Sequence, residues 1–328
     1  MVVLARGEVR AGEGGPSAGG AAILALVGRV EQGRVGRGWA RRRWLLGGAA
    51  LVACAPTLES PGPPSGVDAE AMTSAASELA ARAPGWPVAE ASPFVVTGDL
   101  PAAAIEAAAR DVIAWAVALL RRDFIDRDPP AAVNVWLFAD EASYRRHSLA
   151  LFGVRPSTPF GYYAAARRDL VINYATGDGT LVHELVHPLL HAAYPAAPPW
   201  LDEGLASLFE HCEARAGRLC GLPNWRLPGL QHALRGGQAP SFEALLRSDR
   251  EAFYADVSGT HYAEARYLLY YLQERGALVE YYRRARAGAA LDPSGHDALA
   301  ALAPRLGHAD LGAMRRSWED FVLALRYP

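Results

Sequence analysis

The chain has 328 residues, 51% of them hydrophobic and 21% charged, which is enough apolar material for one large or two modest domains and excludes a disordered or fibrous protein. The formal net charge is -2, but the first 53 residues carry eight arginines against three glutamates, so the remainder holds 25 arginines against 32 acidic residues. A body with this negative balance and no basic stripe lacks the electrostatic footprint of a nucleic-acid-binding protein. We therefore expect no nucleic-acid partner.

The amino-terminal segment has the layout of an export signal. Residues 1–35 are rich in Gly, Ala and Arg and are interpreted as a non-native or disordered leader. Residues 36–53 form a cationic stretch followed by about ten apolar or small residues, which predicts a signal peptide too short to span a bilayer. The segment runs into LVAC and resembles the lipobox of bacterial lipoproteins, in which Cys54 would become the lipidated first residue. The resemblance implies export to the cell envelope, with a lipid anchor at Cys54 holding the protein at the membrane.

Behind the signal, residues 54–90 are expected to form a Pro/Ser/Gly-rich tether and a helix, and strands then alternate with helices. The predicted elements in chain order are a helix at 68–82, a strand at 93–99, a helix at 101–122, a strand at 133–140, a helix at 141–152 and a hairpin at 161–175 with its turn at 166–169.

From residue 178 onward the apolar spacing is mostly helical. The predicted helices are 180–193, 199–211, 241–247, 260–274 and 310–325. Because strands come first and helices follow, the order favours an α+β architecture, with a mixed β-sheet in an amino-terminal lobe and a mainly helical carboxy-terminal lobe.

Two cysteines remain after Cys54, an even number in a compartment that would be oxidising. Cys212 and Cys220 can form a disulfide only if the chain turns between them, for which Gly217 is the natural place, because eight residues of helix would hold them about 12 Å apart. The alternative is two free thiols.

The chemistry is concentrated in the HExxH pattern at residues 183–187. On a helix, His183 and His187 lie four residues apart on one face, so both imidazoles can reach one metal ion. Glu184 lies about 100° round the helix and can address a water molecule on that ion. The interleaved Leu and Val residues predict a buried helix, and buried imidazoles and carboxylates need partners, which a metal supplies.

A third ligand is expected at the segment WLDEGLA, residues 200–206, where Asp202 and Glu203 are the candidates. HExxH followed by a WLxEGxA segment resembles the gluzincin zinc metallopeptidases, in which the glutamate of the second motif binds zinc. That residue is Glu203 here. The compact layout is most similar to the peptidase MA-like domains, and the resemblance covers about residues 93–275. It implies a zincin-like domain at 91–328, whose sheet lobe (91–211) and helical lobe (212–328) enclose the site.

The resemblance also implies two features around the ion. The hairpin 161–173 would supply the edge strand that aligns an extended substrate. A later segment, YAEARYLLYYL, resembles the part of the larger gluzincin aminopeptidases that begins with a catalytic tyrosine, so Tyr262 is the candidate hydrogen-bond donor to the oxyanion, with His261 as its substitute.

Two departures from the family pattern stand out. Pro188 directly follows His187 and removes one helical hydrogen bond, so a kink is expected just past the site. The Gly-Ala-Met-Glu-Asn motif with which gluzincin aminopeptidases anchor a free amino terminus is absent from the sequence. The sequence therefore does not support an aminopeptidase.

The resulting hypothesis is a zinc metallopeptidase that hydrolyses a bond in a peptide or protein substrate. His183, His187 and Glu203 would hold Zn²⁺, Glu184 would act as general base, and Tyr262 would stabilise the oxyanion. One alternative is a catalytically silent binding or assembly module of the cell envelope that retains the zinc site for its structure. A second is a helical scaffold lipoprotein that binds no metal.

Overall fold

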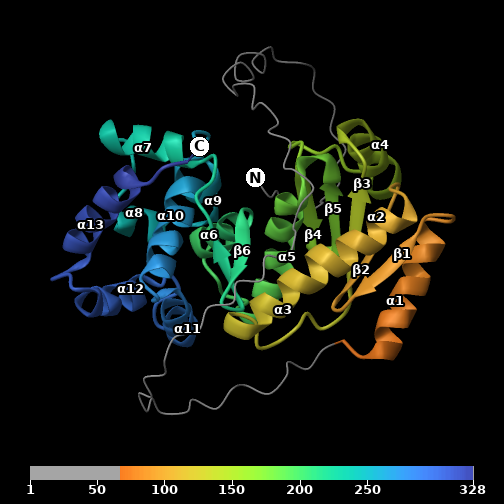
Figure 1. Cartoon of the computed structure of the whole chain (residues 1–328), viewed down its shortest axis with the longest axis horizontal. Helices are drawn as coiled ribbons and strands as arrows, with labels where there is room; N and C mark the ends of the chain where they lie inside the picture. The colour runs from red at the N-terminus through yellow and green to blue at the C-terminus, as the bar shows by residue number, and fades with distance from the viewer. Residues whose placement is uncertain (1–66, 328) are drawn as a thin grey trace, which may run out of the picture. The chain divides into compact units, whose positions relative to one another are not determined.

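A computed structural model of the protein describes residues 67–327 (Figure 1). The leader, the signal peptide, the lipobox with Cys54 and most of the tether predicted from the sequence lie outside these residues. Within them, no helix combines the length and the apolar character that crossing a membrane requires. The helix expected at the end of the tether is confirmed as α1 (Ala69–Arg82), which begins at an Asp68 side chain that caps the backbone N–H of Ala71.

A five-stranded mixed sheet forms the centre of the first part of the chain, in the order β1-β2-β3-β5-β4. Its central strands β2, β3 and β5 are parallel, and β1 and β4 pair antiparallel at the two edges. This confirms an α+β fold with a mixed sheet. The strands are β1 (Val88–Ala91), β2 (Phe94–Gly98), β3 (Val133–Phe138), β4 (Gly161–Ala164) and β5 (Asp169–Asn173).

Helices cover both faces of this sheet, which is why β2 and β5 are buried at every position. In β3, Val133, Val135 and Leu137 face one side, and Trp136 and Phe138 face the other. The first side packs against a helix that runs from Ala102 to Asp123 and against α5 (Asp178–Ala193), and the second packs against α1 and α4 (Glu141–Phe152). The long helix consists of α2 (Ala102–Ala107), a π-helical turn (Ala108–Ile113) and α3 (Ala114–Asp123), and Figure 1 shows it crossing the sheet.

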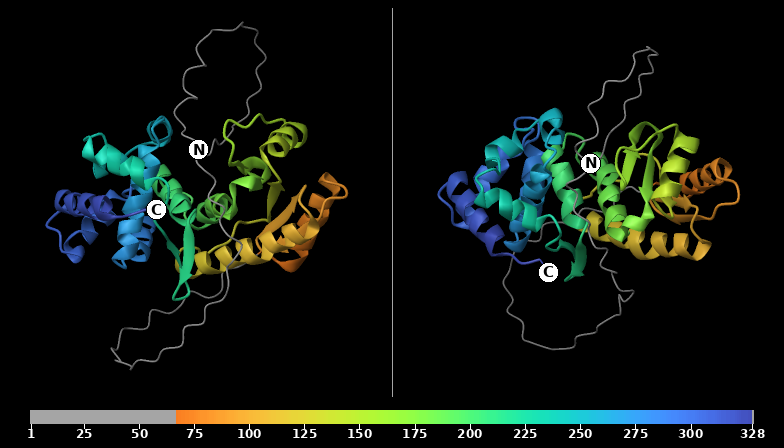
Figure 2. Two further views of the ribbon diagram at one scale, coloured as in Figure 1. Left: turned by 45° about the horizontal axis from the view of Figure 1, so that its top comes forward. Right: turned by 90° about the horizontal axis from the view of Figure 1, so that it is seen from above.

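The rest of the chain is mostly helical, as expected, and in Figure 2 its green-to-blue colours fall mainly on helices. The helices predicted near 199–211, 241–247, 260–274 and 310–325 are confirmed, while β1, the β6–β7 hairpin and four helices were not predicted. The elements are α6 (Pro199–Phe209), β6 (Cys212–Arg215), β7 (Arg218–Gly221), α7 (Leu227–Arg235), α8 (Phe242–Leu246), α9 (Arg250–Tyr254), α10 (Thr260–Glu274), α11 (Leu278–Gly288), α12 (His296–Leu302) and α13 (Leu311–Ala324).

The two cysteines lie on the hairpin of β6 and β7, which turns at Ala216 and Gly217. Cys212 is opposite Gly221 and Cys220 is opposite Glu213, so the two thiols point to opposite faces of the ribbon. Both cysteines are free in the structure. A disulfide between them would require this hairpin to change its register.

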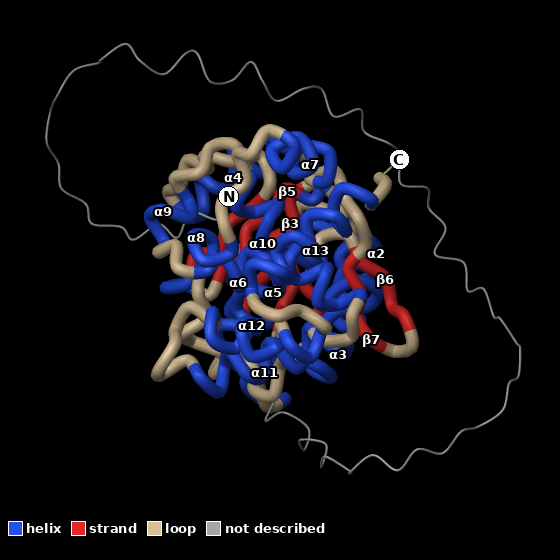
Figure 3. The backbone as a smooth tube through the Cα atoms, turned by 90° about the vertical axis from the view of Figure 1, so that its left-hand side faces the viewer, coloured by secondary structure: helices blue, strands red, loops and turns tan. Residues whose placement is uncertain are grey.

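Helix α6 packs against both α5 and α10, and these three helices occupy the middle of the view in Figure 3. The contact with α10 is close because Gly204 lies at the crossing. A Cβ atom at position 204 would meet the Leu269 side chain at 3.0 Å and Ala265 at 3.3 Å. The glycine after Glu203 therefore lets α6 pack closely against α10. This packing sets the position of Glu203 relative to α5.

We expect Gly204→Ala to lower the free energy of unfolding by about 1–3 kcal/mol, because the added methyl overpacks the α6–α10 contact. Urea unfolding followed by circular dichroism measures this change. Gly229→Ala is the matched control, since Gly229 is also helical but a Cβ there meets nothing within 4 Å. An unchanged unfolding midpoint in Gly204→Ala would contradict the assigned role of this glycine.

Candidate metal centre

Helix α5 carries His183, Glu184 and His187, and all three side chains are buried. The interleaved apolar residues, among them Leu181 and Leu185, belong to the main hydrophobic core and fix the rotation of the helix about its axis. Pro188 lies inside α5 without ending it, because the helix continues to Ala193. The proline thus follows the motif directly while the two histidines stay one turn apart on a continuous helix.

Helix α6 brings Glu203 to the two histidines. Its Oε2 atom lies 3.5 Å from His183 Nε2, and the imidazole centroids of His183 and His187 are 5.2 Å apart. One ligand atom from each of the three residues lies within 4.8 Å of the others. The structure therefore brings together the three residues that the sequence predicted as metal ligands.

The converging atoms lack other partners. Within the described residues, His187 Nε2 and Glu203 Oε2 are buried and make no hydrogen bond, and the same is true of Glu184 Oε2. Leaving buried polar atoms unpaired costs about 1–3 kcal/mol each. A bound cation would give His187 Nε2 and Glu203 Oε2 the partner they lack, so this donor set fits a metal ion.

Asp202, the other candidate for the third ligand, has a different position. Its Oδ1 accepts a hydrogen bond from His187 Nδ1 at 2.7 Å, and its Oδ2 accepts one from His191 Nε2 at 2.8 Å. Because Nδ1 of His187 donates to this carboxylate, Nε2 is the ring nitrogen that would bind a metal ion, after losing any proton it carries. Asp202 thus orients a ligand.

His187, His191 and Asp202 form a second group whose ligand atoms are close enough to hold a metal ion. The two hydrogen bonds to Asp202 already occupy atoms of all three residues. The His191 side chain is also 33% exposed, whereas Glu203 is fully buried. The unpaired atoms therefore favour His183, His187 and Glu203 as the site.

Two residues that the sequence did not reveal support the ligands. The Tyr254 hydroxyl donates to Glu203 Oε1 at 2.7 Å, which leaves Oε2 facing the histidines. Glu210 Oε2 lies 3.9 Å from His183 Nδ1 and is paired with Arg226 Nη1 at 2.5 Å. Tyr254 belongs to the short helix α9 and no motif marks it, so no sequence signal pointed to this contact.

Mutual interactions shift the pKa values in the site. Burial disfavours the charged forms of Asp202 and Glu203, yet neighbouring histidines hold the pKa of each carboxyl group below its ordinary value. Burial would likewise lower the pKa of His187, but the charge and hydrogen bond of Asp202, aided by Glu203 and Glu184, raise it above its ordinary value. Both carboxylates are therefore ionised at neutral pH, whereas His187 tends to hold an extra proton.

Tyr262, the candidate oxyanion donor, is buried, and no group in residues 67–327 forms a hydrogen bond with its hydroxyl. Its ring centroid lies 6.3 Å from that of Tyr254. Burial, followed by the charge of Glu203, raises the pKa of the phenol, so it keeps its proton. His261 Nδ1 instead donates to the Phe253 carbonyl at 3.2 Å. The Tyr262 hydroxyl is thus free to donate a hydrogen bond, whereas the imidazole of His261 is already hydrogen-bonded to the end of α9.

The edge strand β4 begins next to Glu184. A Cβ atom at Gly161 would lie 3.4 Å from Glu184 Oε1 and 3.1 Å from the Val171 carbonyl oxygen. A side chain here would contact the Glu184 carboxylate and crowd the Val171 carbonyl, so glycine lets the backbone of β4 lie close to both. Because β4 pairs with β5 on one side only, its other backbone edge is unpaired within the sheet, in agreement with the edge position expected for the hairpin.

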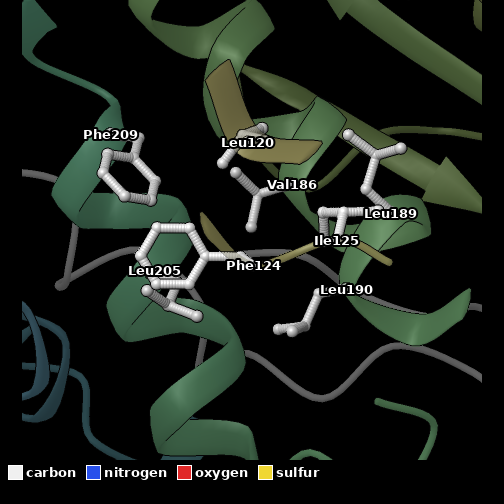
Figure 4. A pocket seen from close by; sticks show the side chains of 8 residues that line it. All are labelled: Leu120, Phe124, Ile125, Val186, Leu189, Leu190, Leu205 and Phe209. Atoms are coloured by element: carbon white, nitrogen blue, oxygen red, sulfur yellow. The ribbon is translucent and has the colours of Figure 1, made fainter. Parts of the chain in front are cut away.

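A small void lies between α3, α5 and α6 (Figure 4). It is lined only by apolar side chains from α3, α5, α6 and the residues that follow α3, including Leu120, Val186 and Leu205. This void offers no polar group to a ligand and belongs to the packing between α3 and the two helices of the site.

Comparisons with known proteins add no assignment: the chain matches no protein-family model, and a search of curated proteins finds no match.

Binding of a divalent cation at His183, His187 and Glu203 should weaken as the pH falls, with Zn²⁺ as the probe ion. The raised pKa of His187 means that an incoming cation must displace a proton from this imidazole, so the association constant falls by up to about tenfold per pH unit for each proton released. Competition with a chromophoric chelator between pH 6 and pH 8 measures the slope. In Asp202→Asn the charge that raises this pKa is removed, and the slope should become shallower. Equal slopes in the two proteins would contradict the linkage.

Tyr254→Phe should lower the association constant for a divalent cation, measured with Zn²⁺ as the probe, by about tenfold, because the loss of its hydrogen bond frees Glu203 to rotate. The same chelator competition measures it. Tyr270→Phe is the control, because the hydroxyl of this α10 tyrosine makes no hydrogen bond in the described structure. If the two variants bind zinc equally well, Tyr254 does not position the ligand.

Proposed function

We propose that the protein is a zinc-dependent metallopeptidase of the gluzincin type, with a peptidase MA-like domain of zincin-like fold whose sheet lobe (91–211) and helical lobe (212–328) enclose the site. The observation that carries the proposal is the convergence of the unpaired atoms His187 Nε2 and Glu203 Oε2 on His183, with the unpaired Glu184 Oε2 on the neighbouring residue of α5. Two imidazoles and one carboxylate are a donor set typical of catalytic zinc, which keeps a fourth position open.

His183, His187 and Glu203 would hold the ion. When bound, zinc supplies Lewis acidity, which brings the pKa of a coordinated water molecule near 7 and polarises a carbonyl group. Asp202 and Tyr254 keep two of the ligands in place through their hydrogen bonds to His187 and Glu203.

Glu184 is the proposed general base. It accepts the proton of the attacking water molecule and passes it to the leaving amine. Its Oε2 atom has no competing partner in the described structure, as a base awaiting a proton requires. This also favours an enzyme over a silent binding module, because a structural zinc site has no need for a buried carboxylate that neither ligates nor pairs.

The surroundings of Glu184 fit a peptide substrate. An extended peptide can add to the open edge of β4 through main-chain hydrogen bonds, and Gly161 would bring that peptide next to the Glu184 carboxylate. The Tyr262 hydroxyl would donate a hydrogen bond to the oxyanion that forms at the attacked carbonyl. The lipobox-like segment before Cys54 supports action in the cell envelope from a lipid anchor.

Two variants separate binding from catalysis. Glu184→Gln should keep about one zinc per chain and lose at least about 100-fold in the rate of peptide hydrolysis, because the general base is gone. Glu203→Ala should lose most of the zinc. Metal analysis and cleavage of a fluorogenic peptide mixture measure both, with Glu243→Gln on the exposed face of α8 as the control.

Comparison of protein termini in cells carrying wild type or Glu184→Gln then identifies the substrates. Full hydrolytic activity in Glu184→Gln would contradict the enzyme, and an unchanged zinc content in Glu203→Ala would remove this residue from the site.

A further inference from the structure

Large apolar side chains are exposed at few places in the described chain, and three of them are connected by sequence or by a contact with residues around the candidate site. Phe160 directly precedes Gly161, Val257 lies on the loop between α9 and α10, and Trp225 contacts Glu210. The large apolar residues with substantial exposure are Leu149, Phe160, Trp225, Val257, Leu291 and Tyr327. Exposed apolar groups beside a polar site are typical of surfaces that recognise a ligand.

Trp225 differs from the others because its ring is held in place although the residue is 51% exposed. Its Nε1–H donates to Glu210 Oε1 at 3.2 Å, and the Arg226 guanidinium lies 4.1 Å from the ring centroid. Glu210 and Arg226 also pair with each other, so the three side chains fix one another. An aromatic ring that is ordered before binding loses little conformational entropy on contact with a partner.

The same carboxylate connects Trp225 with the metal centre. Glu210 Oε1 accepts from the indole, and Glu210 Oε2 lies 3.9 Å from Nδ1 of His183. The indole is thus two side-chain contacts away from His183. Arg226 lies over one face of the indole, and the residue as a whole is half exposed. We take the other face as the one open to a ligand. Since an extended peptide advances about 3.3 Å per residue, a peptide bound at the metal centre would bring to this ring a side chain a few residues from the attacked bond.

We propose that Trp225 is the recognition platform for a large apolar side chain, such as Phe or Leu, of the peptide that binds at the metal centre. The proposal rests on the function inferred above and adds the substrate class. The side chain would lie against the open face of the indole and be removed from water there, which adds affinity in proportion to the apolar area buried. Arg226 and Glu210 act as positioning residues for the ring.

The test uses the full-length Glu184→Gln protein loaded with zinc, which should bind a peptide without cutting it. The probes are fluorescein-labelled octapeptides of Ala, Ser and Gly in which a single Phe occupies each position in turn, and fluorescence anisotropy gives the Kd. At one or two positions, Phe should tighten binding by about tenfold relative to Ser. Adding Trp225→Ala should abolish this preference, and adding Leu291→Ala, a residue 95% exposed between α11 and α12, should leave it unchanged.

Trp225→Phe separates the platform from the hydrogen bond to Glu210, because it keeps an aromatic face and removes the N–H donor. It should retain most of the preference for Phe. Three results would each overturn the platform: the preference is lost in Trp225→Phe, it persists in Trp225→Ala, or the parent protein does not show it. The last result would mean that the exposed indole has another partner.

Hydrolysis of the same peptides by the wild type distinguishes the two proposals. If the peptides are cut at equal rates with and without Phe, the platform fails while the peptidase stands. If Phe tightens binding through Trp225 but no peptide is cut, the peptidase fails while the platform stands.

Discussion

The fold is organised around a few buried polar atoms that its own side chains do not satisfy. His187 Nε2 and Glu203 Oε2 are enclosed where α5 meets α6, in surroundings built otherwise from the main hydrophobic core. Desolvated nitrogen and oxygen atoms without partners destabilise a fold. The protein keeps them and aligns them through Asp202 and Tyr254. A cation at this point would give both atoms the partner they lack, so the arrangement fits a metal site.

The apolar packing around these atoms determines their geometry. Alternating strands and helices place α5 against one face of the sheet, and Gly204 lets α6 settle between α5 and α10. Gly161 brings the free edge of β4 against Glu184 in the same way. Two glycines thus allow close packing next to a carboxylate of the site, and a side chain at either position would crowd the neighbouring atoms.

Much of this could be predicted from the sequence. The four-residue spacing of His183 and His187 needs only a helix to place both imidazoles on one face. The choice between Asp202 and Glu203 was harder, because neighbouring residues point about 100° apart and only the packing of α6 decides which one faces the histidines. Tyr254 has no local signature, since its contact with Glu203 joins residues far apart in the sequence. The β6–β7 hairpin was missed because its short strands are rich in charge and its turn contains Ala216 at a positive φ, where glycine or asparagine is the usual signal.

An anomalous difference map recorded at the zinc absorption edge, from crystals of the zinc-loaded protein, tests the central claim most directly. The account predicts one strong peak at about 2.0–2.2 Å from the ring nitrogens of His183 and His187 and from a carboxylate oxygen of Glu203. A peak between His191 and Asp202, or no peak at either group, would contradict it.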